Sequence, residues 1–141
     1  MTGESTAIGA RGRFAAARVA VLSTVAPAGQ PHLVPVTFAL TGDTLWSATD
    51  GKPKRGGHLR RHRNIAGEPR VSLLVQHWDE EWSRLWWVRA DGLATVTDEP
   101  ATVARAVAAL SAKYEQYQHV ALGPPVIEVR VTGWRSWPDP A

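Results

Sequence analysis

The sequence predicts a mainly β protein in which six antiparallel strands form a small closed barrel, accompanied by short helices. Twelve glycines and ten prolines among 141 residues indicate many turns, and closely spaced turns connect short strands. Apolar residues make up 44% of the chain and charged residues 21%, which is a globular balance. A chain of this length is expected to form one domain, residues 1–141, with its own core.

The first part of the chain is predicted to form one short helix followed by three strands. Residues 5–18 favour a helix, although Gly9 and Gly12 weaken it. Strands are predicted at 19–25, 32–40 and 44–49, separated by turns at 27–30 and 41–43. Because these turns are short, the three strands are expected to pair in sequence order as an antiparallel meander.

The second part is predicted to add three strands and two helices. In order, these are a helix at 58–66, strands at 71–76 and 82–97, a helix at 100–117 and a strand at 126–134. Leu59, His62 and Ile65 share one face of the first helix, which is therefore expected to be its buried face. Asp98 and Pro100 suit the N-cap and first turn of the second helix. Closing six strands into a barrel leaves no unpaired edge.

Positive charge is concentrated in one segment of the chain. The net charge is +3, yet residues 50–70 hold seven basic side chains and two acidic ones. Such a block indicates either an anionic partner or a solvated face. Lys52, Lys54 and Arg55 precede a predicted helix start, and loop cations, loop amides and a helix N-terminus together form a recurrent anion site. A solvated basic loop is the alternative.

Several kinds of chemistry are disfavoured by the residues that are missing. The chain has no cysteine, which excludes disulfides and thiolate nucleophiles and suits a reducing cytoplasm. No Gly-x-Ser-x-Gly motif is present, so no catalytic side chain is assigned and a cofactor is expected to supply any chemistry. His58 and His62 have metal-ligand spacing, but the neighbouring arginines would repel a dication, so no metal is expected. No apolar run approaches the ~20 residues of a membrane span.

Tryptophan is abundant, with seven residues in the chain. Trp86 and Trp87 point to opposite faces if they lie on one strand, so both faces need cover. If one face fills the barrel, the other requires a helix, a planar ligand or a second subunit. Large apolar residues on both faces of the strand predicted at 82–97 favour the second subunit, and hence a homodimer.

Six short segments carry a family resemblance through their order and spacing. They are residues 29–38, 52–54, 59–61, 64–65, 69–75 and 82–89. Together they resemble the flavin and deazaflavin split β-barrel superfamily, and most of all the actinobacterial coenzyme F420-dependent oxidoreductases of the pyridoxamine-phosphate-oxidase-like class. The resemblance runs from about residue 19 to residue 137.

The resemblance implies a homodimer with two cofactor sites at the subunit interface. Basic residues after the third strand hold the cofactor phosphate, the second and third strands contact its ring system, and the partner closes the site from the connection between the fourth and fifth strands. The matching positions in this sequence are Val34, Pro35, Val36, Ser47, Ala48, Thr49, Lys52, Lys54, Arg55, Trp78 and Trp82. Gly57 and His58 stand where some relatives carry Asn near the helix start, which is a departure from the family pattern.

Charge favours F420 over FMN as the cofactor. F420 carries a phosphodiester, a carboxylate and a polyglutamate tail, so it needs a longer cationic track than a single phosphate does. The leading hypothesis is a cytoplasmic reductase that transfers a hydride from reduced F420 to an unsaturated or quinone-like small molecule. The alternatives are an FMN-dependent oxidase or reductase and a non-catalytic binder of cofactor or nucleic acid. Nucleic acid is disfavoured as a partner because the basic residues are not interleaved with aromatics along a groove.

Overall fold

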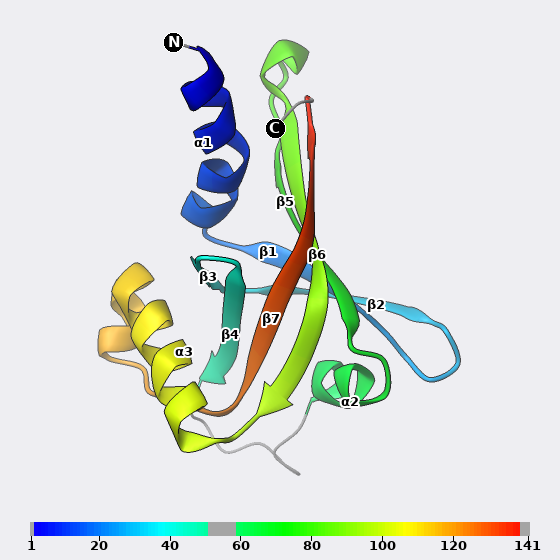
Figure 1. Cartoon of the computed structure of the whole chain (residues 1–141), viewed down its shortest axis with the longest axis vertical. Helices are drawn as coiled ribbons and strands as arrows, with labels where there is room; N and C mark the ends of the chain where they lie inside the picture. Colours follow the sequence, from blue (N-terminus) through cyan, green and yellow to red (C-terminus); the bar gives the residue numbers. More distant parts are fainter. Residues whose placement is uncertain (1, 51–58, 139–141) are drawn as a thin grey trace.

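The body of the molecule is one antiparallel sheet, which the computed structural model describes together with its helices for residues 2–50 and 59–138 (Figure 1). The strands are β1 Ala20–Val25, β2 Pro31–Val36, β3 Ala39–Thr41, β4 Thr44–Asp50, β5 Arg70–His77, β6 Trp86–Thr97 and β7 Leu122–Trp137. The helices are α1 Thr2–Ala16, α2 Arg60–Gly67 and α3 Pro100–Lys113, with short 3₁₀ helices η1 Trp82–Arg84 and η2 Glu115–Gln118.

The strand order across the sheet is β2-β1-β5-β6-β7-β4-β3. The prediction of a mainly β, antiparallel protein is confirmed, but the count of six strands is wrong, because the segment expected as one strand at 32–40 is interrupted at Thr37 and Phe38. The expected meander is present only in part: residues 31–36 pair with β1 and residues 39–41 pair with β4, but the strand is interrupted between them, and the other edge of β4 pairs with β7. β1 and β2 do form the expected hairpin, with Val25 opposite Pro31.

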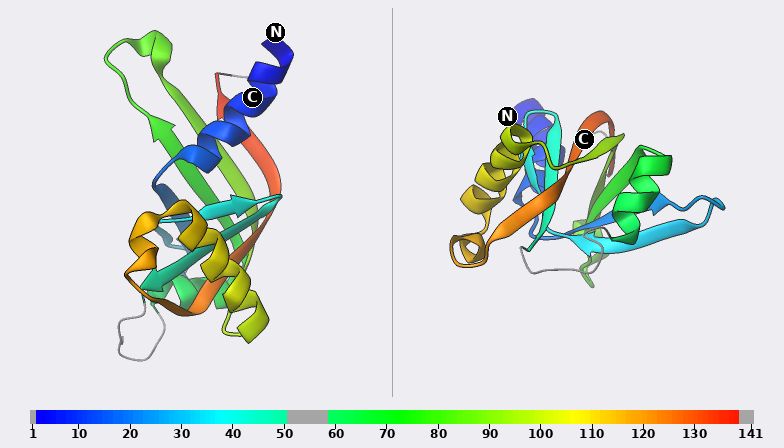
Figure 2. Two further views of the ribbon diagram at one scale, coloured as in Figure 1. Left: turned by 90° about the vertical axis from the view of Figure 1, so that its left-hand side faces the viewer. Right: turned by 90° about the horizontal axis from the view of Figure 1, so that it is seen from below.

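The two strands on either side of Thr37 and Phe38 occupy opposite ends of the strand order. The sheet is strongly curled, so that β1 and β2 run across β6 and β7 (Figures 1 and 2). No hydrogen-bonded ladder between described residues joins β2 to β3. The curled sheet therefore agrees with a split barrel, while the expected closure of the barrel is not confirmed.

Several other element boundaries differ from the predictions, including that of the last strand, which begins at Leu122 and not at residue 126. The strand expected to begin at residue 82 starts at Trp86, because the preceding residues form η1. The helix expected to reach residue 117 ends at Lys113 and is followed by η2. Its N-cap is Glu99 and not Asp98, since the Glu99 carboxylate accepts hydrogen bonds from the backbone N–H groups of Ala101 and Thr102 at 3.0 and 2.8 Å. Those bonds satisfy N–H groups that a helix start leaves without intrahelical partners.

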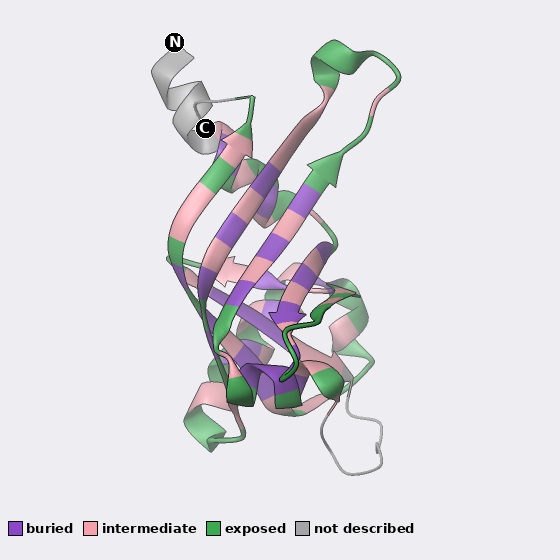
Figure 3. Cartoon of the chain, turned by 90° about the vertical axis from the view of Figure 1, so that its right-hand side faces the viewer, coloured by how far each residue is buried: buried purple, intermediate pink, exposed green. Residues whose placement is uncertain are grey.

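Burial alternates along the central strands, so one face of the sheet forms the main core (Figure 3). Along β5, Val71, Leu73 and Val75 are buried, while the residues between them are partly exposed. Phe14 of α1 is fully buried in this core and contacts Phe38 at 5.0 Å between ring centroids. A second, smaller cluster lies between α3 and β4. In the described part of the chain, no helix is long and apolar enough to cross a lipid bilayer.

Candidate cofactor site

A cavity of about 360 Å³ lies beside β2 and β4, where these strands meet the start of α2 and the segment after α3. Its volume falls within the range of small-molecule sites in proteins. The lining residues come from all four segments: Pro35, Val36, Thr37, Ala48, Thr49, Leu59, Arg61, Gln116, Tyr117 and Val120. The walls thus combine apolar side chains with hydroxyl groups and one cation, which suits a planar ring system that carries an anionic group.

Four of the residues expected to contact a cofactor ring line this cavity, namely Pro35, Val36, Ala48 and Thr49. The other two expected strand residues, Val34 and Ser47, are not among the residues that line it. Val34 packs against the main core. Ser47 is buried, and its hydroxyl donates a hydrogen bond to the Thr37 carbonyl at 2.8 Å. Ser47 therefore holds the backbone of Thr37, which lines the cavity.

Arg61 brings a positive charge into the cavity. Its side chain is partly buried, and this burial lowers the pKa of the guanidinium below its ordinary value, although arginine stays protonated in proteins. No described carboxylate forms an ion pair with Arg61. A partly desolvated cation without a counterion is the electrostatic setting in which an anionic ligand binds well.

The sequence placed Arg61 in the basic segment but did not single it out as a cavity residue. Helical spacing could have predicted its partial burial, because Arg61 lies four residues before Ile65 and therefore next to the buried face of α2. The expected burial of His62 and Ile65 is confirmed. Arg60 and Arg63 are exposed on the same helix, so these three arginines do not share one environment.

The three basic residues expected to hold a phosphate, Lys52, Lys54 and Arg55, lie outside the described residues. Thr49 and Leu59, which lie close to them in the sequence on either side, both line the cavity. His58, considered above as a metal ligand, also lies outside the described residues. Among the residues that are described, no group of three or more His, Cys, Asp or Glu side chains is arranged to bind a metal.

Trp78 and Trp82 lie at the far end of the molecule from the cavity. They belong to the connection between β5 and β6, which projects away from the end of the sheet that carries α2 (Figures 1 and 2). Their exposed fractions are 64% and 68%. Within one chain, these two tryptophans therefore do not meet the strand residues with which the sequence grouped them.

The outer face of the sheet carries an apolar groove of about 520 Å³. Val21, Leu33, Leu74 and Trp87 supply its apolar surface, together with polar residues of β1, β5 and β6. Leu33 is 64% exposed. Trp86 packs against the main core on the other face, so the prediction that Trp86 and Trp87 face opposite sides is confirmed.

Comparison with known proteins identifies the fold and the family. Rv2991, a conserved protein of Mycobacterium tuberculosis, is 25% identical, with a TM-score of 0.68 over 89% of this chain and 80% of that one. A haem-binding protein of Mycobacterium smegmatis is also 25% identical, with a TM-score of 0.68 over 94% of this chain and 53% of that one. A FAD-binding protein of Mesorhizobium loti shares the fold at 20% identity, with a TM-score of 0.67 over 92% of each chain.

The comparison with curated proteins gives no match. The family model for pyridoxamine 5'-phosphate oxidase matches residues 10–138, which is most of the chain. That range contains every described residue of the cavity and of the outer groove. This chain is therefore a member of the pyridoxamine 5'-phosphate oxidase family.

Proposed function

We propose that this protein is an oxidoreductase that binds a flavin-type cofactor in the cavity beside β2 and β4. The observation that carries the proposal is the Arg61 guanidinium, which lies partly buried in a cavity whose other lining residues are apolar or uncharged and polar. Membership of the pyridoxamine 5'-phosphate oxidase family and the likeness to a FAD-binding protein support the choice of a flavin-type ring.

The described residues fit such a cofactor. Pro35, Ala48 and Leu59 offer apolar surface for a planar ring, and the Arg61 guanidinium offers charge-assisted hydrogen bonds to a phosphate or carboxylate. When bound, a flavin or deazaflavin supplies the hydride chemistry through its own ring. The contribution of this chain is to orient the ring and to keep water away from one side of it.

We infer that the cofactor is F420 and that the acceptor is an unsaturated or quinone-like small molecule. Arg60 and Arg63 are exposed on α2, so cationic surface extends along this helix beyond Arg61 in the cavity. A phosphodiester with a carboxylate tail can use such an extended surface, whereas a single phosphate cannot. FMN is the second candidate, because the FAD-binding relative points to an ordinary flavin.

Two copies of the chain are proposed to form the working unit. The exposed groove around Leu33 and Trp87 would supply an apolar interface of the kind that stable dimers bury. In such a dimer, Trp78 and Trp82 of one copy would close the cavity of the other. We expect this dimer to act in the cytoplasm, in keeping with a chain that has no cysteine.

The test is a titration of the purified protein with F420, FMN and haem in parallel, followed by absorbance and fluorescence. Arg61→Gln is the informative variant, and Arg60→Gln, at an exposed position of the same helix, is expected to weaken binding less, because water and salt screen a surface contact. Loss of one charge-assisted hydrogen bond costs about 1.5–3 kcal/mol, so Arg61→Gln is expected to weaken binding roughly 10- to 150-fold. Wild-type affinity in Arg61→Gln would remove Arg61 from the site, and failure of both F420 and FMN to bind would overturn the proposed function.

A further inference from the structure

The corner between β2 and β3 is held by side chains from distant parts of the chain. The Phe38 backbone N–H donates to the Tyr114 hydroxyl at 3.1 Å, and the Phe38 carbonyl accepts from the Lys113 ammonium at 3.0 Å. The Thr37 carbonyl accepts from the Ser47 hydroxyl at 2.8 Å. Every one of these partners is a side chain, so the corner keeps its backbone hydrogen bonds without a strand ladder.

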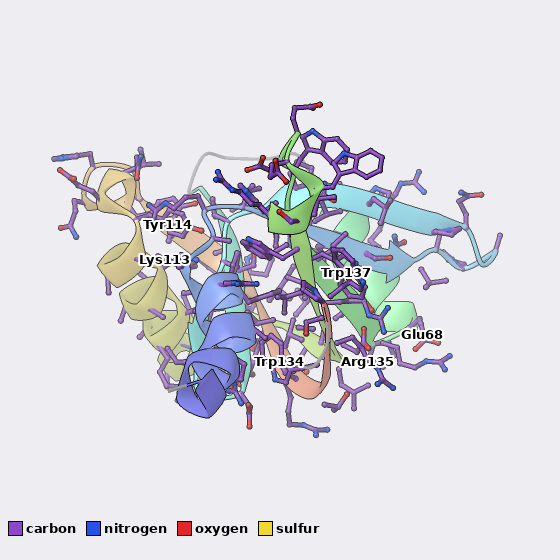
Figure 4. All side chains as sticks on the ribbon, turned by 90° about the horizontal axis from the view of Figure 1, so that it is seen from above. Glu68, Lys113, Tyr114, Trp134, Arg135 and Trp137 are labelled. Carbon is purple, nitrogen blue, oxygen red and sulfur yellow. The ribbon has the colours of Figure 1, made fainter. Side chains whose placement is uncertain are left out.

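The end of α3 and the first residues after it provide most of these contacts. Lys113 and Tyr114 lie side by side at this end of the helix (Figure 4). The Tyr114 hydroxyl accepts the hydrogen bond from Phe38 and donates its own hydrogen to the Arg18 carbonyl at 2.9 Å. It therefore has no hydrogen left to donate to a ligand. The Tyr117 ring packs edge-on against the Tyr114 ring, with 5.6 Å between centroids. Tyr117 is thereby placed against the same corner.

Tyr117 and Thr37 differ from the other members of this group because both line the cavity. Their hydroxyl oxygens are 2.7 Å apart, which is a short hydrogen bond in which either group can donate. Neither hydroxyl makes another hydrogen bond to a described residue. Two hydroxyl groups carry two hydrogens, and one hydrogen serves the bond between them. Whichever group donates, one O–H remains for an acceptor in the cavity.

We propose that Thr37 and Tyr117 act as a paired hydrogen-bond donor that recognises a carbonyl or ring-nitrogen acceptor on the bound cofactor ring. This inference rests on the proposed function, since it assigns a partner within the same cavity. Flavins and deazaflavins share a pyrimidinedione edge rich in such acceptors, and that edge gains electron density when the ring is reduced. A fixed donor at this edge positions the ring and stabilises its reduced form.

The corner contacts make this donor preorganised. Ser47, Lys113 and Tyr114 hold the backbone on which Thr37 sits, so the hydroxyl pair does not have to be ordered when a ligand binds. Removing one hydroxyl leaves the other still able to donate, but without the neighbour that orients it. The two single variants are therefore expected to lose part of the effect, and the double variant all of it.

The experiment compares Thr37→Val, Tyr117→Phe and the double variant, each titrated with F420 and with FMN. The double variant is expected to bind the cofactor roughly 2- to 12-fold more weakly, from one neutral hydrogen bond of about 0.5–1.5 kcal/mol. The absorbance maxima of the bound cofactor are expected to shift, and its reduction potential to fall. Each single variant is expected to give a smaller change.

Thr41→Val is the matched control, because it removes a hydroxyl that accepts a hydrogen bond from Trp46, takes no part in the corner contacts and does not line the cavity. It is expected to lower thermal stability while leaving the spectrum of the bound cofactor unchanged. A double variant with wild-type affinity, spectrum and potential would overturn the inference, even if Arg61→Gln still weakened binding and the proposed function stood. If the wild-type protein bound neither F420 nor FMN, the proposed function and this inference would fail together.

Discussion

Replacement of Gly92 by alanine is expected to destabilise the fold through a clash that the surrounding strands cannot relieve. Gly92 lies where the pairing of β6 with β7 shifts register. A Cβ atom at this position would lie 2.5 Å from the Arg130 carbonyl oxygen and 2.8 Å from the Val129 Cγ1 atom, whereas ordinary contacts begin at 3.4 Å. The carbonyl belongs to the backbone of β7, which also pairs with β4 at Arg130, so it cannot simply rotate away.

The expected loss of stability follows from the overlap between the added methyl group and β7. Strands that must separate locally to admit one methyl group lose about 1–3 kcal/mol, as other overpacked cores do. For a chain of this size, that corresponds to a fall of roughly 3–10 °C in the melting temperature. Gly133→Ala is the control, because Gly133 lies at the same register shift and a Cβ there meets nothing within 4 Å. Its effect is expected to stay within about 0.5 kcal/mol.

The assay is urea unfolding followed by the fluorescence of the seven tryptophans. Gly92→Ala is expected to shift the midpoint to lower urea with little change in slope, because the surface exposed on unfolding hardly changes. If Gly92→Ala and Gly133→Ala unfolded at the same midpoint, the claim that β6 and β7 are too closely packed at Gly92 for a side chain would be refuted.

Two further predictions concern pH and association. Burial and the nearby charge of Arg18 lower the pKa of Lys113 from 10.5 to about 8. Between these pH values the unfolded state binds more protons than the folded state does. The free energy of unfolding is therefore expected to rise with pH from about 8 to 10. Urea midpoints at pH values near 7.5 and 9.5 should show this rise in the wild type and a smaller one in Lys113→Met; equal rises would contradict it. Leu33→Glu puts a charge into the exposed outer groove and is expected to convert a dimer into a monomer by light scattering, whereas a monomeric wild type would end the dimer proposal.

The alternation of apolar and polar residues was enough to predict most strands and helices. It failed at Thr37 and Phe38 because no glycine or proline interrupts the sequence there. At the interruption, the Phe38 backbone N–H donates to the hydroxyl of Tyr114, which is 76 positions away in the chain. The meander was only partly correct for a related reason. Short turns indicated the β1–β2 and β3–β4 hairpins, but the interruption between β2 and β3 and the pairing of β4 with β7 depend on contacts between distant parts of the sequence.

In the site too, local sequence patterns predicted some features, whereas contacts between distant residues could not be predicted. The order of the motifs located the cavity on the correct strands, because that information is local. The choice between Val34 and Pro35, or between Ser47 and Ala48, depends on which face of each strand turns toward the cavity. Tyr117 was missed because its partner Thr37 is 80 positions away, and no periodic pattern joins a residue after a helix to a corner between strands.

The pairing of β4 with β7 has a consequence for how the protein is made. β4 ends at Asp50, and its partner begins at Leu122. During synthesis, more than half of the chain must follow β4 out of the ribosome before that edge can be covered. The edge of β4 therefore stays unpaired until β7 has been synthesised. During this time, wrong strand pairing and chaperone binding compete with folding. Cells that express this protein at a faster rate of elongation should shorten that wait and recover more folded chain.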